Sequence, residues 1–263
     1  MKDTRRLLNG LIACGAVLAM VSTLAAQPAD QVPVKVVNIK GGPRYKLGNN
    51  DWQPLRLGDI VQPGTVIQTA AKSRVDLALG AQALPSTSPE AAGAAAASSS
   101  APSSYQPTSE QNIVRLWENT LMGVDKMTET HTGADVVTEA QLDLKAGHIT
   151  GSVKKMSAAS KFEVKIPNGV AGIRGTVFDI SAEGLIKVLS GSVVLAYVGP
   201  SGSVSTQVIM GNQMFDARTG ALSPLPPSSI HDLQVTARAM SAGLASGPTP
   251  VSGNGSLQYI SPH

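Results

Sequence analysis

The chain has 263 residues, with 21 Lys and Arg against 18 Asp and Glu, and 3% of its residues are aromatic. The first 26 residues hold three of the basic residues and one of the acidic ones, so the remainder has 18 against 17 and is nearly neutral. Because the remainder has no Lys/Arg cluster that could follow a phosphate backbone, nucleic-acid binding is excluded as its function. The length allows one core of ordinary size, built mostly from Val, Ile, Leu and Ala.

The N-terminus has the three-part pattern of a secretory signal peptide. Lys2, Arg5 and Arg6 precede an apolar stretch from Leu7 to Ala26, and a polar, proline-bearing run follows. This order of basic, apolar and small residues is typical of a sequence that directs export. We therefore predict a signal helix in residues 1–26, with cleavage after Ala26, and a mature protein that is periplasmic or secreted.

Two alternatives to cleavage stay open. The stretch Leu7–Ala26 has about the roughly 20 residues that span a bilayer, so it could remain as an inner-membrane anchor and would be the chain's contact with the membrane. Residues 11–14 resemble a lipobox, which would place a lipid on Cys14. Cys14 is also the only cysteine, so the mature protein would form no disulfide of its own and must depend on its core.

Between residues 32 and 215, short apolar runs alternate with turn residues. The clearest period-2 segments are 74–79 and 162–166, and Pro63-Gly64 suits a type II turn. The other predicted strands are residues 34–39, 52–57, 60–61, 65–69, 113–117, 121–124, 136–144, 149–153, 171–178, 185–189, 192–198 and 203–210, with a turn at Ser190-Gly191. This pattern predicts an all-β fold, a two-sheet sandwich or roll of short, mostly antiparallel strands.

Residues 81–111 interrupt the predicted domain. They consist mainly of Ala, Ser and Pro, and they contain a run of Ala and Ser that has no side chain able to build a core. An isolated alanine helix of this length is marginal in water. We predict an insertion that is disordered for most of its length.

The C-terminal part begins with a predicted Pro-rich linker, residues 216–229. Ile230, Leu233, Ala237 and Met240 then recur at three- and four-residue spacing, which predicts a short helix over residues 230–243 with one apolar stripe. We expect this stripe to dock on the parent domain, with a partner-binding helix as the alternative. Residues 244–263 are predicted to be a disordered tail.

Two stretches in this order resemble a known domain family. The first has W-Q-P-L-x-L-G-D-x-V-x-P-G-T at residues 52–65, and the second has G-x-I-x-G-x-V at 147–153 and V-A-G-I-R-G-T-x-F at 170–178. Together they resemble the FecR domain, the periplasmic domain of ferric-citrate-type transmembrane regulators. The resemblance implies an extracytoplasmic all-β domain, here residues 32–215, that relays a signal through protein contacts. It singles out eight residues, to which it assigns a structural role: Trp52, Gly58, Asp59, Gly64, Gly172, Arg174, Gly175 and Phe178.

The chain also departs from the family pattern. Regulators of this kind have a cytoplasmic domain that binds a sigma factor, whereas six residues precede the apolar stretch here. The residues after Leu222 are few and rich in Pro, Ser and Gly, unlike the C-terminal subdomain that meets the outer-membrane receptor. We therefore expect a stand-alone FecR-like domain without the sigma-binding domain.

One glycine-rich segment, Gly169-x-x-Gly172-x-x-Gly175, superficially resembles a phosphate loop. It lacks the helix and the Lys-Ser/Thr pair that such a loop uses, so we interpret it as a strand crossing with close backbone approach. Arg174 stands among apolar residues, so we expect its guanidinium to be partly enclosed and to bind a carboxylate or carbonyl oxygen. A structural fork is the favoured role, and ligand recognition is the alternative.

No pattern in the sequence predicts catalysis. Asp59 is expected to cap its own turn, and no second carboxylate stands at a spacing that implies a catalytic pair. The four histidines are scattered, without the spacing of metal ligands: His131, His148, His231 and His263. A G-x-S-x-G nucleophile motif is also absent from the sequence. We predict no catalytic, cofactor-binding or metal-binding residues.

The sequence therefore favours a non-enzymatic binding or signalling module of the cell envelope that works through protein–protein contacts. Its partner would be an unidentified envelope protein. The alternative is a structural or adhesive surface protein that binds a polysaccharide or another matrix component.

Overall fold

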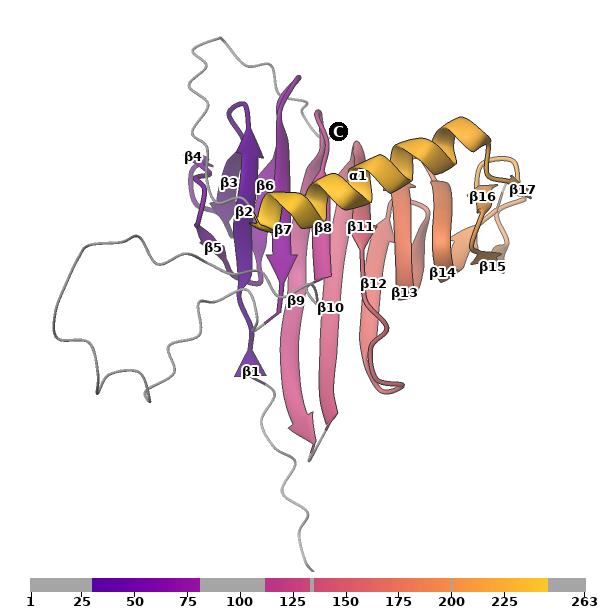
Figure 1. Cartoon of the computed structure of the whole chain (residues 1–263), viewed down its shortest axis with the longest axis horizontal. Helices are drawn as coiled ribbons and strands as arrows, with labels where there is room; N and C mark the ends of the chain where they lie inside the picture. Colours follow the sequence, from indigo (N-terminus) through magenta and orange to yellow (C-terminus); the bar gives the residue numbers. More distant parts are fainter. Residues whose placement is uncertain (1–29, 81–111, 133–134, 200, 246–263) are drawn as a thin grey trace, which may run out of the picture.

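The structure is a computed structural model that describes residues 30–80, 112–132, 135–199 and 201–245 (Figure 1). The predicted signal segment, the predicted insertion at 81–111 and residues 246–263 of the predicted tail lie outside the described residues. The described strands are β1 (Asp30–Gln31), β2 (Val34–Lys40), β3 (Arg44–Leu47), β4 (Gln53–Pro54), β5 (Ile60–Val61), β6 (Thr65–Gln68), β7 (Arg74–Leu79), β8 (Asn112–Leu116), β9 (Leu121–Thr132), β10 (Asp135–Ala146), β11 (His148–Ser152), β12 (Lys161–Ile166), β13 (Gly169–Ser181), β14 (Leu185–Val198), β15 (Val204–Met210), β16 (Gln213–Asp216) and β17 (Ala221–Pro224). The described helix is α1 (Pro227–Ala245).

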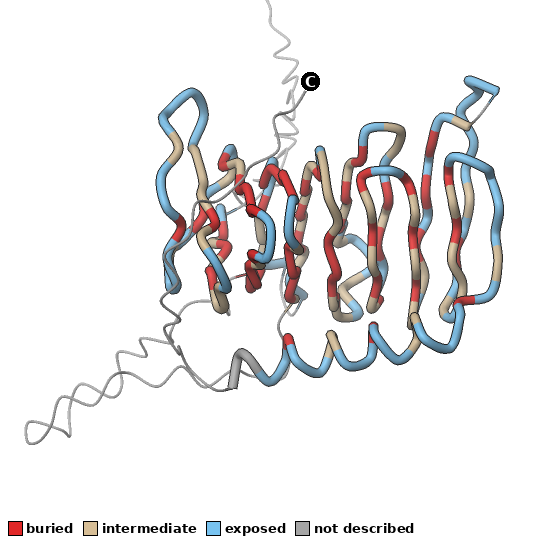
Figure 2. Tube along the Cα trace, turned by 90° about the horizontal axis from the view of Figure 1, so that it is seen from above, coloured by how far each residue is buried: buried red, intermediate tan, exposed pale blue. Residues whose placement is uncertain are grey.

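The strands form one continuous sheet that is folded into two layers (Figure 2). The order β4-β3-β6-β9-β10-β12 makes layer one, and β5-β2-β7-β8-β11 makes layer two. Each pairing is antiparallel except that of β10 with β12. The predicted two-sheet roll of mostly antiparallel strands is thus confirmed, although β9, β10, β13 and β14 are long, with 12 to 14 residues.

Strands β13 and β14 belong to both layers. The first residues of β13 pair with β12 in layer one, and its last residues pair with β11 in layer two. Correspondingly, the end of β14 pairs with β15 in layer one, and its beginning pairs with β16 in layer two. The two long strands are therefore the fold line of the roll.

Two glycines allow this fold line. Gly175 has φ +59° and Gly191 has φ +79°, which L-residues with a side chain rarely adopt. A Cβ at Gly191 would lie 2.1 Å from the carbonyl oxygen of Gly175, so the two backbones approach as closely as glycine permits. The predicted turn at Ser190-Gly191 is wrong, because the chain bends there inside one strand instead of ending it.

The core lies between the two layers and is mostly aliphatic, with a few aromatic rings. Phe162 and Phe178 are almost fully buried and meet edge to face, with ring centroids 6.5 Å apart. Gly151 pairs with Phe178 across β11 and β13, and a Cβ there would lie 2.3 Å from the Phe178 ring. This close contact explains a glycine in the middle of a buried strand.

Helix α1 runs across the outer face of layer two, where it contacts β2, β8, β11, β13 and β14 (Figures 1 and 2). Leu233 and Met240 are its buried side chains, as the predicted apolar stripe requires. The predicted linker at 216–229 is wrong in part, since β17 pairs with β16 there. The helix begins at Pro227, because proline suits the first helical position, and it extends to Ala245. None of the helices in the described ranges is long and apolar enough to cross a membrane.

Candidate functional site

A row of polar side chains crosses layer two beneath α1. Five neighbouring strands each contribute one residue, and each residue is paired directly with the next: Asp76 of β7, Arg115 of β8, Thr150 of β11, Asp179 of β13 and Lys187 of β14. Directly opposed residues of neighbouring strands point to the same face of a sheet. The five side chains therefore form a continuous row on the face that the helix covers.

The deepest part of the row is an ion pair. The Nε of Arg115 donates to Oδ1 of Asp76 at 2.6 Å, and its Nη2 donates to Oδ2 at 2.7 Å. The two side chains are 4% and 1% exposed. The sequence predicts an enclosed guanidinium bound to a carboxylate at Arg174, but the structure has this arrangement at Arg115, and Arg174 is exposed. That expectation was wrong because the alternation of β13 turns Ile173 into the core and Arg174 outward.

The row continues as a chain of hydrogen bonds. Nε1 of Trp117 donates to the hydroxyl of Thr150, and this hydroxyl donates to Oδ2 of Asp179, each at 2.8 Å. Nζ of Lys187 lies 3.9 Å from Oδ1 of Asp179. The ring of Trp117 stacks with that of His148, with centroids 5.6 Å apart and planes 16° apart. These contacts hold the indole in a fixed orientation at the end of β8.

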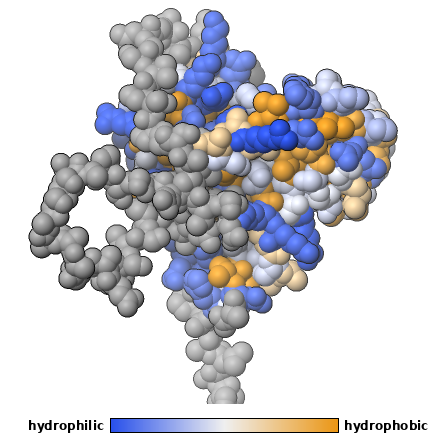
Figure 3. All heavy atoms as spheres, in the orientation of Figure 1, coloured by the Kyte–Doolittle hydropathy of each residue, from blue (hydrophilic) through white to orange (hydrophobic). Residues whose placement is uncertain are grey.

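A groove of about 670 Å³ lies between this end of the row and the first half of α1. Trp117, His148, Thr150, Asp179 and Lys187 form its floor. The helix side is lined mainly by Ser229, His231, Asp232, Leu233 and Thr236, and Ser181, Glu183 and Leu185 line the rim. The lining thus mixes apolar groups with charges of both signs. In Figure 3, apolar residues gather on this face of the molecule near the start of α1, next to hydrophilic ones.

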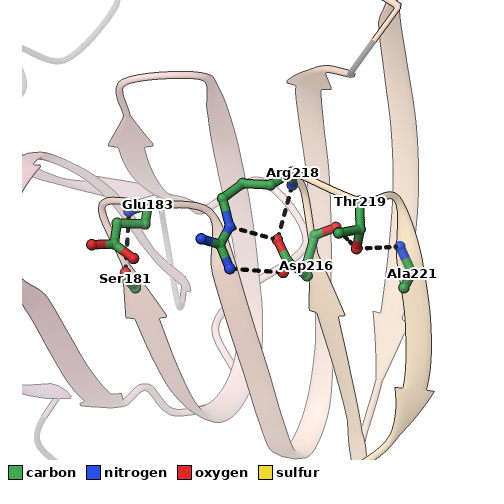
Figure 4. A network of polar contacts seen from close by, with 6 residues as sticks. All are labelled: Ser181, Glu183, Asp216, Arg218, Thr219 and Ala221. Carbon is green, nitrogen blue, oxygen red and sulfur yellow. Dashed lines mark hydrogen bonds and ion pairs between the residues drawn. The ribbon is translucent and has the colours of Figure 1, made fainter.

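A turn network stands beside the rim (Figure 4). The carboxylate of Asp216 accepts hydrogen bonds from the backbone N–H of Arg218 at 2.9 Å and from its guanidinium at 3.0 and 3.2 Å. The guanidinium bonds hold the pKa of Asp216 below its ordinary value. The N–H of Ala217 donates to the carbonyl of Gly184, which joins this turn to the one that contains Glu183. The network therefore connects the β16–β17 turn to the groove rim.

The family-motif residues in the first stretch lie away from the groove. The guanidinium of Arg44 lies over the Trp52 ring, 4.7 Å from its centroid. Gly58 and Gly64 have φ +86° and +89°, as their turns require. Oδ2 of Asp59 accepts the N–H of Arg56 at 2.8 Å, which caps its own turn. None of these residues lines the groove.

The second group is divided between core and surface. Phe178 is buried in the core and Gly175 lies at the fold line, while Gly172 and Arg174 line a separate cavity of about 190 Å³ against Phe162. The motif residues therefore do not converge on one site. Within the described ranges, no group of three or more His, Cys, Asp and Glu side chains could hold a metal ion.

In the sequence, His148 and His231 are isolated histidines, and no motif connects Trp117, Arg115 or Asp179 with a site. The sequence feature that could have indicated the polar row is a polar residue at an outward position in each of several strands. Its meaning depends on the pairing order, in which β11 joins β8 to β13. That order cannot be read from strand patterns alone.

Comparison with known proteins gives a family match in the same region. The model of the family described as FecR protein matches residues 106–194, so the resemblance seen in the sequence is confirmed over that stretch. A search among curated proteins found no match. Two crystal structures of a "putative anti-sigma factor" from Parabacteroides distasonis are similar at 16% and 17% identity, each with a TM-score of 0.34. The matches cover 48% and 51% of this chain and 56% and 58% of those chains.

Proposed function

We propose that this chain, in which residues 106–194 match the FecR family, is a non-enzymatic binding and signalling module outside the cytoplasm that works through protein–protein contacts. The observation that supports it best is the position of the groove. Its floor and rim come from the matched stretch, and α1, which lies outside that stretch, closes its other side. The groove is thus where the FecR-like strands meet an element that the family match does not include.

The chemistry of the groove suits side chains of another protein. Asp179 is already engaged by Thr150 and Lys187, so its carboxylate is held in the row and is not a free general base. Leu185 and Leu233 add apolar surface beside these charges. Protein interfaces combine apolar contact with a polar rim in this way, whereas small-molecule sites are lined predominantly by apolar groups.

The experiment is capture of the exported chain with its partner from envelope extracts after crosslinking. Lys187→Glu reverses the charge at the groove floor and should abolish capture of a partner that the unmodified chain retains. Lys126→Glu, at an exposed position of β9, is the matched control and should not affect capture. Equal capture by both variants would contradict a role for the groove.

Polysaccharide binding is the second candidate, and one observation favours it. The stacked Trp117 and His148 rings lie in the groove near the carboxylates of Asp179 and Glu183, which could accept hydrogen bonds from sugar hydroxyls. The polysaccharide hypothesis predicts that the chain is retained on cell-wall or glycan material without a defined protein partner, and that Trp117→Ala reduces this retention. Loss of a protein partner in Lys187→Glu with no glycan retention would exclude it.

A further inference from the structure

The hairpin of β14 and β15 lies within the longest stretch of the chain that has no charged residue. From Val188 to Phe215 the sequence contains no Lys, Arg, Asp or Glu, although the chain has 21 basic and 18 acidic residues. This run forms most of β14, all of β15 and most of β16. The segments of β14 and β15 that pair with each other, residues 192–198 and 204–210, thus carry no charge. This is unusual for an exposed hairpin, because charged side chains are a common means of keeping sheet edges apart.

The outer face of this hairpin is apolar, and its side chains are exposed among the described residues. Val194 pairs with Val208, and Val198 pairs with Val204 across β14 and β15. Their exposed fractions are 45% and 48%, and 47% and 77%. Helix α1 covers layer two, whereas this face belongs to layer one, so the helix does not shield it.

Strand β15 is also an edge strand. Among the described strands it pairs with β14 alone, through seven consecutive residue pairs without a bulge. It contains none of the devices that protect edges, since it has no charge, no proline and no irregularity. Its other side presents backbone N–H and C=O groups that another strand can pair with. Two of these groups are bonded to side chains, since the carbonyl of Val208 accepts from Nε2 of Gln207 at 2.7 Å and the N–H of Met210 donates to Oε1 of Gln213 at 2.8 Å. A pairing strand replaces these two side-chain bonds with backbone bonds.

We propose that β15 pairs with β15 of a second copy of this chain, antiparallel and centred on Gln207. Centring on Gln207 places all seven residues opposite a partner, with Val204 opposite Met210 and Thr206 opposite Val208 on the outer face. Any other register leaves strand ends unpaired. The resulting contact is isologous, with the same surface on both copies, as in the commonest class of oligomers.

The absence of charge on β15 favours a second copy of this chain as the partner of its edge. Every position of β15 and of its flanking turns is neutral, so a charged partner strand would find no opposite charge there, and a neutral strand matches this edge better. The chain supplies such a strand in the hairpin itself. Two-fold pairing also joins the two apolar outer faces into one continuous surface, since apolar or β-branched residues stand opposite one another there.

The proposal does not depend on the groove, so it can fail while the proposed function holds. The first test uses sedimentation of the exported, processed chain. Gln207→Lys and Gln207→Glu each place two like charges directly opposite at the two-fold axis, and each should weaken the dimer by about tenfold or more. An equimolar mixture of the two variants should restore it. Val235→Lys, at a helix position that is 50% exposed, should leave the dimer intact.

The second test uses single cysteines in a Cys14→Ser background, where no other thiol is present. Gln207→Cys brings two cysteines to directly opposed positions, where Cβ atoms are about 4.5–5.5 Å apart, so mild oxidation should crosslink the dimer. Ser205→Cys places them four residues apart along the strand, about 13 Å, and should not crosslink. A monomeric parent chain, a mixture that fails to restore the dimer, or equal crosslinking by both variants would each overturn the proposal.

Discussion

Breaking the Arg115–Asp76 pair by one substitution tests the energetics of the polar row most sharply. The side chains are 4% and 1% exposed and share two charge-assisted hydrogen bonds of 2.6 and 2.7 Å. Asp76→Ala leaves the guanidinium of Arg115 buried without its carboxylate, which costs about 3–5 kcal/mol in comparable pairs. Because folded domains are stable by roughly 5–15 kcal/mol, this loss is a large fraction of the total free energy of unfolding.

The assay is equilibrium unfolding in urea, followed by far-UV circular dichroism and the fluorescence of Trp52 and Trp117. With a slope of about 2–3 kcal/mol/M, a loss of about 3–5 kcal/mol lowers the urea midpoint by about 1–2.5 M. Replacing both partners, with Asp76→Leu and Arg115→Met together, removes the unpaired charge. The double variant should therefore recover most of the loss.

The exposed pair of Arg218 and Asp216 provides the control. Its side chains are 62% and 20% exposed, so Arg218→Ala should change the urea midpoint little. An Asp76→Ala midpoint no lower than that of Arg218→Ala would refute the reasoning. So would a double variant as unstable as the sum of its two single substitutions.

Three further predictions concern the fold line, the helix and the rim. Gly191→Ala should lower the free energy of unfolding by more than the roughly 1–3 kcal/mol of a strained backbone, because its Cβ would lie 2.1 Å from a backbone oxygen. Gly48→Ala is the control, since Gly48 has φ +58° and open space around it, and it should show the backbone cost alone in urea unfolding. Met240→Ala should cost about 2–5 kcal/mol and speed hydrogen exchange in α1 before layer one, and unchanged exchange would contradict the docking. The lowered pKa of Asp216 contributes stability that is present above its unfolded pKa and is lost as the pH falls through the folded pKa. The urea midpoints of the parent chain and Asp216→Asn should therefore differ more at pH 6 than at about pH 2. Because Asp216 also accepts the backbone N–H of Arg218, which Arg218→Ala leaves in place, this difference should exceed that of Arg218→Ala, and an equal difference at both pH values would count against the lowered pKa.

The fold class was predictable because its determinants are local. Alternating segments such as 74–79 and 162–166 have the period that a half-buried strand requires, and both are strands in the structure. The match to FecR at residues 106–194 confirms the family resemblance for the second motif, whereas the first motif at 52–65 lies outside the matched stretch. The apolar stripe of α1 likewise appears in the sequence at helical spacing, and its residues Leu233 and Met240 are buried.

The path of the long strands was not predictable, because a glycine in an apolar run is typical of a turn as well as of a bend. Ser190-Gly191 was assigned a turn, yet the neighbouring Gly175 supplies the space for β14 to continue. The strands β3, β16 and β17 were missed since their residues do not alternate clearly in the sequence. Pairing with neighbours, and not local preference, makes them strands.

The candidate groove was also beyond sequence reasoning. Arg174 was the natural choice for an enclosed arginine because its neighbours are apolar, whereas Arg115 has the same kind of neighbours and is the one that is buried. What distinguishes them is that β7 places Asp76 directly opposite Arg115. Asp76 and Arg115 are 39 positions apart in the sequence, so their ion pair exists only once β7 and β8 have paired.

The central claim is that the groove beneath α1 is the contact site of a protein partner. Its most direct test is a photo-crosslinking residue at Glu183, an exposed position on the groove rim, compared with one at Thr132, an exposed position of β9. The claim predicts one discrete protein adduct from position 183 in intact cells, lost when Lys187→Glu is added, and none from position 132. Equal adducts from both positions, or an adduct that survives Lys187→Glu, would contradict it.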